Sequence, residues 1–196
     1  GISPAMSPEA PPVWSTYVDV ASVDDTLAKA AASGGQTIVE AMDVGEAGRM
    51  AMLADPEGAV IGLWQAKEHR GAGLVNEPNA WTWNELMCDD PEKAKQFYAG
   101  VFGWGEVTNG DGDSQYTEWQ VGGRSIGGML KKPAEMPPMT SFWTVYIQVA
   151  DIEAAAKRLS ELGGQVIRPP MEIDQGTFTV VTDPAGAMFN LFEVKG

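Results

Sequence analysis

The chain contains an internal repeat, and this repeat restricts its fold more than any other feature of the sequence. Residues 13–39, VWSTYVDVASVDDTLAKAAASGGQTIV, align without gaps to residues 142–168, FWTVYIQVADIEAAAKRLSELGGQVIR. Residues 54–66, ADPEGAVIGLWQA, likewise match residues 182–194, TDPAGAMFNLFEV. Self-similarity over a unit of about 55 residues indicates a structural module that the chain uses more than once.

A third copy lies between these two, at residues 80–131, and it matches them in the order of its elements rather than in its residues. Each copy begins with an alternating apolar and polar run, continues through a capping residue into a helical pattern, and ends in two or three strand-like runs. The sequence therefore predicts three βαβββ modules and an α+β fold.

The helix of each module has a clear start and one apolar face. Asp90 can cap the middle helix, and Pro91 suits its first position because the N–H that proline lacks is unpaired there anyway. Ser22 and Asp151 are the predicted caps of the other two helices. The predicted buried stripes are Val23, Thr26, Leu27 and Ala30; Ala94, Phe97, Tyr98 and Val101; and Ile152, Ala155, Ala156 and Leu159.

The opening strands alternate as half-buried strands do, with one side toward the helix and one side away from it. The side away from the helix mixes polar and aromatic groups, which suits the lining of a cavity better than a packed core. Trp14 and Trp143 alternate with that side, so both are predicted to be core residues, and Cys88 is predicted to be buried on the helix side. Trp104 is expected to pack where the middle helix ends.

These modules resemble those of the vicinal oxygen chelate superfamily, which includes glyoxalases, extradiol dioxygenases and bleomycin-resistance proteins. The resemblance is carried by DDPEKAKQFYAGVFGW at residues 89–104, by Asp-Pro-x-Gly before two closing strands, and by the modular order. It covers nearly the whole chain and extends to the two-domain actinobacterial type. It implies that βαβββ modules pair into curved mixed sheets that enclose a cleft.

The resemblance also suggests a domain organisation. We expect residues 80–196 to be a complete C-terminal domain of two modules, residues 69–79 to be a linker, and residues 13–68 to be one module, half of an N-terminal domain. Residues 1–12 resemble the end of the middle module, so we interpret them as the end of a missing upstream module plus a linker. A true three-module chain that pairs its first module with a second copy is the alternative.

Metal-dependent relatives take a ligand from the opening strand, seven residues before the helix cap, and a Glu from the closing strand, seven residues after the Asp of Asp-Pro-x-Gly. The opening-strand positions here are Ser15, Trp83 and Thr144, and the closing-strand positions are Gly62 and Asn190. None is a credible ligand for a divalent ion, so no metal and no cofactor are expected. An enzyme of the glyoxalase or dioxygenase type, with ligands located elsewhere or lost with a missing module, is the alternative.

The residues predicted to bind a ligand share the cleft side of the strands with these positions. Their aromatic rings, amides and one carboxylate suit a planar or cationic small molecule. Glu85 is interpreted as a hydrogen-bond acceptor for the ligand, with a surface role as the alternative, and no catalytic residue is assigned. The alternative for the whole set is that its aromatics fill the space left by a lost site. The predicted ligand-binding residues are Trp83, Glu85, Met87, Thr144, Tyr146, Gln148, Asn190 and Phe192.

Composition limits the partners and the compartment. A net charge of −14 argues against nucleic acid as a partner and permits a cationic ligand, although acidity also serves solubility. No apolar run approaches the roughly 20 residues that span a membrane. The single cysteine fits a reducing, cytoplasmic location, and His69 is expected to be a solvated linker residue. A small-molecule ligand is the expected partner, together with either a second copy of the chain or a missing N-terminal module.

Overall fold

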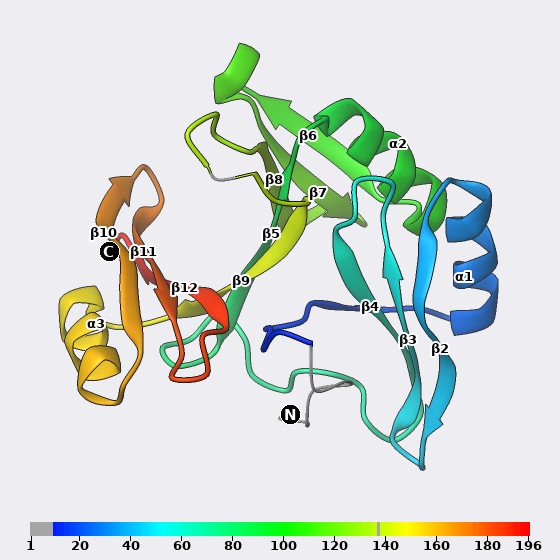
Figure 1. Ribbon diagram of the computed structural model, residues 1–196, viewed down its shortest axis with the longest axis horizontal. Helices are drawn as coiled ribbons and strands as arrows, with labels where there is room; N and C mark the ends of the chain where they lie inside the picture. The colour runs from blue at the N-terminus through cyan, green and yellow to red at the C-terminus, as the bar shows by residue number, and fades with distance from the viewer. Residues whose placement is uncertain (1–9, 137) are drawn as a thin grey trace. The chain divides into compact units, whose positions relative to one another are not determined.

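The computed structural model describes residues 10–136 and 138–196, and these contain three βαβββ modules (Figure 1). Most of the predicted segment 1–12 therefore lies outside the described residues. The first module comprises β1 (Tyr17–Asp19), α1 (Val23–Ala32), β2 (Gln36–Val44), β3 (Gly48–Ala54) and β4 (Val60–Ala66). The second comprises β5 (Trp81–Cys88), α2 (Pro91–Phe102), β6 (Gly105–Asn109), a short 3-10 turn (Gly112–Ser114), β7 (Tyr116–Val121) and β8 (Arg124–Lys131). The third comprises β9 (Phe142–Gln148), α3 (Ile152–Glu161), β10 (Gln165–Ile173), β11 (Gly176–Thr182) and β12 (Met188–Val194).

The strands of each module are ordered in the same way. The opening strand pairs in parallel with the closing strand, and the closing strand continues antiparallel into the two middle strands. The orders are β1-β4-β3-β2, β5-β8-β7-β6 and β9-β12-β11-β10. The predicted α+β fold built from βαβββ modules is confirmed.

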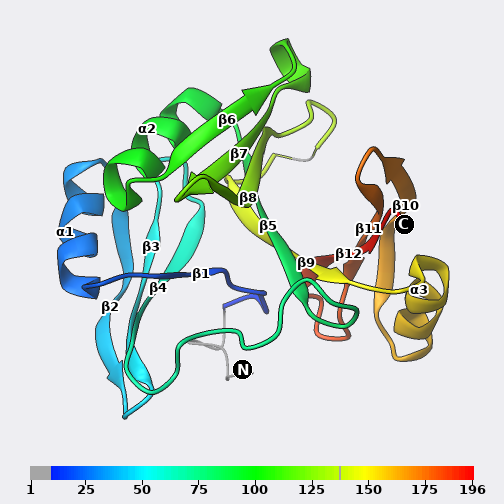
Figure 2. The same cartoon turned by 180° about the vertical axis from the view of Figure 1, so that it is seen from behind.

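The chain forms two compact units. Unit 1 contains the third module from Thr144 onward, together with the segments up to Trp14 and from Leu74 to Thr82. Unit 2 contains the first and second modules, Ser15–Gly73 and Trp83–Trp143, and within it α1 and α2 lie side by side in both views (Figures 1 and 2). The domain boundaries inferred from the sequence stay a prediction.

The helices begin where the sequence indicates. The side chain of Ser22 accepts a hydrogen bond from the backbone N–H of Asp25, that of Asp90 from Glu92 and Lys93, and that of Asp151 from Ala154. Each cap satisfies a backbone donor that has no partner within its helix. The predicted stripes face the sheets, with Leu27, Ala155 and Leu159 only partly buried.

The closing strands add a second contact to two of these helix starts. The backbone N–H of Val23 donates to Oε1 of Gln65 on β4 at 3.0 Å, and that of Ile152 donates to Oε2 of Glu193 on β12 at 2.7 Å. The corresponding residue of the second module is a lysine, and its helix begins with Pro91, which has no N–H to donate. The first and third helices are thus tied to their own closing strands by a side chain.

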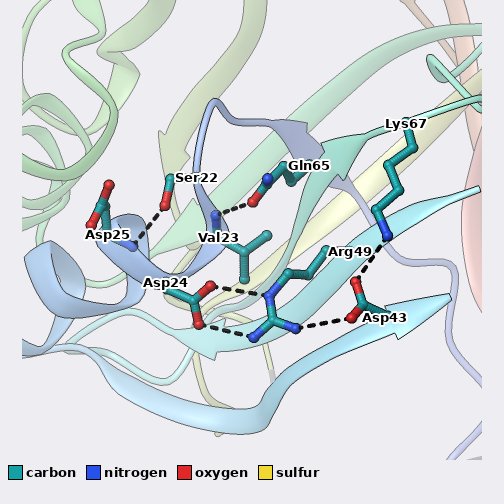
Figure 3. A network of polar contacts seen from close by, with 8 residues as sticks. All are labelled: Ser22, Val23, Asp24, Asp25, Asp43, Arg49, Gln65 and Lys67. Carbon is teal, nitrogen blue, oxygen red and sulfur yellow. Dashed lines mark hydrogen bonds and ion pairs between the residues drawn. The ribbon is translucent and has the colours of Figure 1, made fainter.

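Figure 3 shows this helix start in the first module together with a chain of ion pairs beside it. Nε and one Nη of Arg49 donate to the two carboxylate oxygens of Asp24, both at 3.0 Å. A third guanidinium nitrogen lies 3.7 Å from Oδ2 of Asp43. The other carboxylate oxygen of Asp43 forms an ion pair with Nζ of Lys67 at 3.2 Å. The hydrogen bond from Arg49 holds the pKa of the Asp24 carboxyl below its ordinary value.

The core of unit 2 is an aromatic cluster on the helix side of the second module. The ring of Tyr98 stacks on that of Trp104 at 5.6 Å and meets those of Trp119 and Trp143 at 5.4 Å. Trp143 and Cys88 are buried, and Trp104 packs where α2 ends, so these three predictions are confirmed.

The prediction for Trp14 is wrong, because this side chain is 43% exposed and rests on Phe189 of unit 1 with ring centroids 5.3 Å apart. The prediction extended the alternation of the opening strand back to residue 14. The strand starts only at Tyr17, whereas its counterpart in the third module already starts at Phe142. Trp14 precedes the paired strand, so its side chain does not follow the in-and-out alternation of that strand.

Across the described residues, no helix is long and apolar enough to cross a bilayer.

Candidate functional site

One face of each sheet points away from its helix, and we call it the inner face. Its position is fixed by the same register in every module: Tyr17 pairs with Gly62, Glu85 with Gly128, and Tyr146 with Asn190. Gly62, Gly128 and Asn190 are therefore structurally equivalent. In the second module, where the Asp-Pro-x-Gly turn is missing, the register identifies the closing-strand position as Gly128.

The inner face of the second module carries a chain of three hydrogen-bonded side chains. Nε1 of Trp83 donates to the hydroxyl of Tyr116 at 3.0 Å, and this hydroxyl donates to Oε2 of Glu85 at 2.9 Å. Glu85 is only 9% exposed, and Met87 is equally buried. Burial raises the pKa of Tyr116, and the nearby charge of Glu85 raises it further, so the phenol keeps its proton.

Tyr116 occupies the space that a side chain at position 128 would need. A Cβ added to Gly128 would lie 1.9 Å from the Tyr116 hydroxyl oxygen and 3.0 Å from Nε1 of Trp83. In the first module a tyrosine also lies close to the equivalent glycine, but it comes from the opening strand: a Cβ at Gly62 would lie 2.4 Å from the ring of Tyr17. Both glycines thus allow a tyrosine to approach the closing strand closely.

The inner face of the third module, in unit 1, is arranged differently. Nδ2 of the buried Asn190 donates to Oγ1 of Thr144 at 2.9 Å and to the backbone carbonyl of Val145 at 3.2 Å. The ring of Tyr146 contacts those of Phe178 and Phe192, with centroid distances of 6.2 and 6.4 Å.

The predicted ligand-binding residues therefore form one group in each unit. Tyr116 links Trp83 to Glu85 in unit 2, while unit 1 brings Thr144 to Asn190 and Tyr146 to Phe192. Gln148 continues the same strand, and its backbone N–H donates to Ala80 at 2.9 Å. Whether these groups bind a ligand stays a prediction.

The sequence analysis did not identify Tyr116 and Phe178 as inner-face residues. They occupy equivalent positions, because Glu118 pairs with Gly128 and Val180 pairs with Asn190, each two residues further along its strand. The alternation in QYTEWQV and GTFTVVT contained the signal, but these middle strands have no helix cap or Asp-Pro-x-Gly turn that indicates which of their sides faces inward.

The positions that the family resemblance assigns to metal ligands carry neutral or apolar side chains in this chain. Thr144 and Asn190 are neutral and form a hydrogen bond with each other. Trp83 lies close to Gly128, and the space beside this glycine is occupied by Tyr116. Neither pair offers the charged oxygen or imidazole ligands that a divalent ion prefers. Within the described part of the chain, no three His, Cys, Asp or Glu side chains are grouped so that they could hold a metal ion. His69 is an exposed linker residue, as predicted, and its backbone carbonyl accepts Nε1 of Trp64 at 2.7 Å.

The family model of the Glyoxalase/Bleomycin resistance protein/Dioxygenase superfamily matches residues 81–191. CFP32 of Mycobacterium tuberculosis, whose name proposes a glyoxylase, is 41% identical, and the match covers 97% of this chain and 73% of that protein. DnrV of Streptomyces peucetius, an anthracycline biosynthesis protein by name, is 29% identical, with 94% of this chain and 67% of that protein covered.

Solved structures agree with the fold. The 2,3-dioxygenase LapB from Pseudomonas sp. KL28 superposes with a TM-score of 0.60 at 18% identity, covering 91% of this chain and 69% of that one. A Mn(II)-bound glyoxalase from Novosphingobium aromaticivorans gives 0.58 at 17% identity, covering 90% and 61%. These likenesses concern the fold of the chain.

Proposed function

Because this chain belongs to the Glyoxalase/Bleomycin resistance protein/Dioxygenase superfamily, we propose that it is a member that binds a planar aromatic small molecule without a metal ion. One observation carries the proposal. At the positions where metal-dependent relatives have ligands, this chain has a neutral hydrogen-bonded pair, Asn190 and Thr144, and a tyrosine seated over Gly128.

The inner face of the second module supplies what a planar ligand needs. Indole and phenol rings offer large apolar faces, and stacking on such rings contributes about 0.5–1.5 kcal/mol beyond the burial of area. The carboxylate of Glu85, placed beside Trp83 and Tyr116, favours a ligand that also carries a hydrogen-bond donor or a positive charge. The net charge of −14 acts in the same direction, because it attracts cations from solution.

The inner face of the third module offers a similar surface in unit 1. The rings of Tyr146, Phe178 and Phe192 are arranged tilted or edge to face, which leaves ring faces and edges for an aromatic ligand. The DnrV relative is named for the biosynthesis of anthracyclines, which are planar polycyclic molecules, and this name supports the same ligand class.

The test combines metal analysis with ligand binding. Protein purified without chelator and without a metal-affinity step is analysed for metal content, and it is then titrated with fluorescent aminomethylanthracene, a planar ring system that carries an ammonium group. We expect well under one equivalent of metal per chain and saturable binding. Trp83→Leu should weaken binding about tenfold, which is the upper range of one stacking contact. Trp14→Leu, at an exposed indole of unit 1, is the matched control.

A second candidate, a metal-dependent enzyme of the glyoxalase or dioxygenase type, is favoured by the name of the mycobacterial relative. Metal analysis separates the two candidates directly. About one equivalent of Ni, Zn, Fe or Mn per chain, combined with no binding of the anthracene, would replace the first proposal by the second.

A further inference from the structure

The hydroxyl of Tyr116 is the central group of the inner face in the second module, since it is both the acceptor of Trp83 and the donor to Glu85. We propose that the carboxylate of Glu85 makes this face select ligands bearing a hydrogen-bond donor, an ammonium or a hydroxyl group, and that Tyr116 is a specificity-determining residue that moderates this selection, because its own proton competes with the ligand for Glu85. The inference rests on the proposed function and names the chemistry of the ligand.

A tyrosine hydroxyl has one hydrogen to donate, and here it is donated to Glu85. Tyr116 therefore has no hydrogen left for a carbonyl or carboxylate oxygen of a ligand. A ligand that carries its own donor can take the place of the phenol on Glu85, and a charged donor forms the stronger bond with a carboxylate.

The burial of Glu85 increases the difference in affinity between ligands with a donor and ligands with acceptors only. Glu85 is 9% exposed, so an acceptor-only anion that approaches it meets a poorly screened negative charge. Burial also raises the pKa of Tyr116, so the phenol stays a neutral donor near neutral pH and does not add a second negative charge.

Gly128 of the closing strand has no side chain, and Tyr116 occupies the space that this leaves. Any Cβ at Gly128 would collide with the phenol oxygen at 1.9 Å, so an alanine there must displace Tyr116 from Trp83 and Glu85. The equivalent pair in the third module, Phe178 and Asn190, has no hydroxyl on its aromatic ring. The hydroxyl that competes for the carboxylate in the second module thus has no counterpart on Phe178 in the third.

The experiment compares probes that share one ring system, namely aminomethylanthracene, hydroxymethylanthracene and anthracenecarboxylate. Wild-type protein should bind the first two more tightly than the carboxylate. Tyr116→Phe keeps the ring but removes the donor to Glu85, so the preference for aminomethylanthracene over the carboxylate should rise roughly three- to tenfold, the range expected for one net hydrogen bond. Gly128→Ala, which keeps the hydroxyl but moves it, should shift the preference in the same direction.

Tyr17→Phe is the matched control, because it removes a tyrosine hydroxyl from the first module, and it should leave the preference unchanged. Thermal melting of each variant shows that it is folded. If the wild type binds the probes and both Tyr116→Phe and Gly128→Ala leave the preference unchanged, this inference is wrong while the proposed function stands. If the wild type binds no probe, the proposed function is wrong and the inference falls with it.

Discussion

The phenol of Tyr98 donates a 3.0 Å hydrogen bond to the buried carboxylate of Asp55, although 43 residues separate the two in sequence. The same phenol accepts a hydrogen bond from Nε1 of Trp143 at 2.8 Å. The other carboxylate oxygen of Asp55 accepts the backbone N–H groups of Glu57 and Ala59, both at 2.9 Å. The Asp-Pro turn of the first module is thereby bonded to the helix of the second within unit 2.

Tyr98→Phe should lower the free energy of unfolding by about 1–3 kcal/mol, because Oδ2 of Asp55 loses its donor and Nε1 of Trp143 loses its acceptor in a buried site. Burial raises the pKa of Asp55, and the Tyr98 hydroxyl opposes this rise, so the variant raises that pKa further. When the pKa of a carboxyl is higher in the folded state than in the unfolded state, the folded protein loses stability as the pH rises through the folded-state pKa. The deficit of the variant should therefore grow from acid toward neutral pH in denaturant titrations. A deficit that shrinks with rising pH would contradict this account.

Trp119→Phe should cost less stability than Trp143→Phe, although Trp119 is the more buried of the two, at 1% exposure against 8%. The indole N–H of Trp119 is buried without an acceptor among the described residues, whereas that of Trp143 donates to Tyr98. Removing an unsatisfied donor recovers about 1–3 kcal/mol, which offsets much of the cavity that the smaller ring leaves. Chemical denaturation of both variants checks the order, and equal losses would indicate that Trp119 has a water partner.

Gly62→Ala should destabilise the protein by about 1–3 kcal/mol, the usual cost of overpacking, because the new Cβ would lie 2.4 Å from the ring of Tyr17. Gly73→Ala is the matched control, since its added Cβ has no atom within 4 Å. In the Tyr17→Ala background the substitution at Gly62 should cost much less. If Gly62→Ala is equally harmful in both backgrounds, the close approach of the tyrosine does not explain the glycine.

Cys88 should react slowly with thiol reagents in the native protein. Burial raises the pKa of its thiol to about 12, with the carboxylates of Glu57 and Asp55 adding to the rise, so little thiolate exists at pH 8. Reaction with Ellman's reagent should be complete in denaturant and should require opening of the structure in its absence. A native rate similar to that of the denatured chain would show that the thiol is accessible.

Local rules predicted much of the fold. The caps at Ser22, Asp90 and Asp151 and the apolar stripes depend on neighbours within one or two helical turns, so they can be read from the sequence. The repeat then identified the modules and the side of each opening strand that faces away from its helix. The error at Trp14 arose because periodicity shows the phase of a strand but not the residue at which its ladder begins.

The candidate site was predicted only in part, for a different reason. Trp83 and Glu85 could be placed on one face by counting, but Tyr116, which joins them, lies on the adjacent hairpin, and a middle strand has no cap or turn motif that fixes its phase. The bond between Tyr98 and Asp55 likewise requires the packing of two modules within unit 2. Contacts of this kind are set by tertiary packing, which neither repeat nor motif contains.

The contact between helix and closing strand has a consequence for hydrogen exchange. The amide hydrogens of Val23 and Ile152 are donated to Gln65 and Glu193, outside their own helices. Ordinarily the first amides of a helix exchange quickly because they lack internal partners. In this chain, exchange at these two positions requires that the bond to the side chain of the closing strand opens first. Labelling at Val23 and Ile152 should therefore report how often the first and third modules release this contact, whereas Pro91 leaves the second module without such an amide.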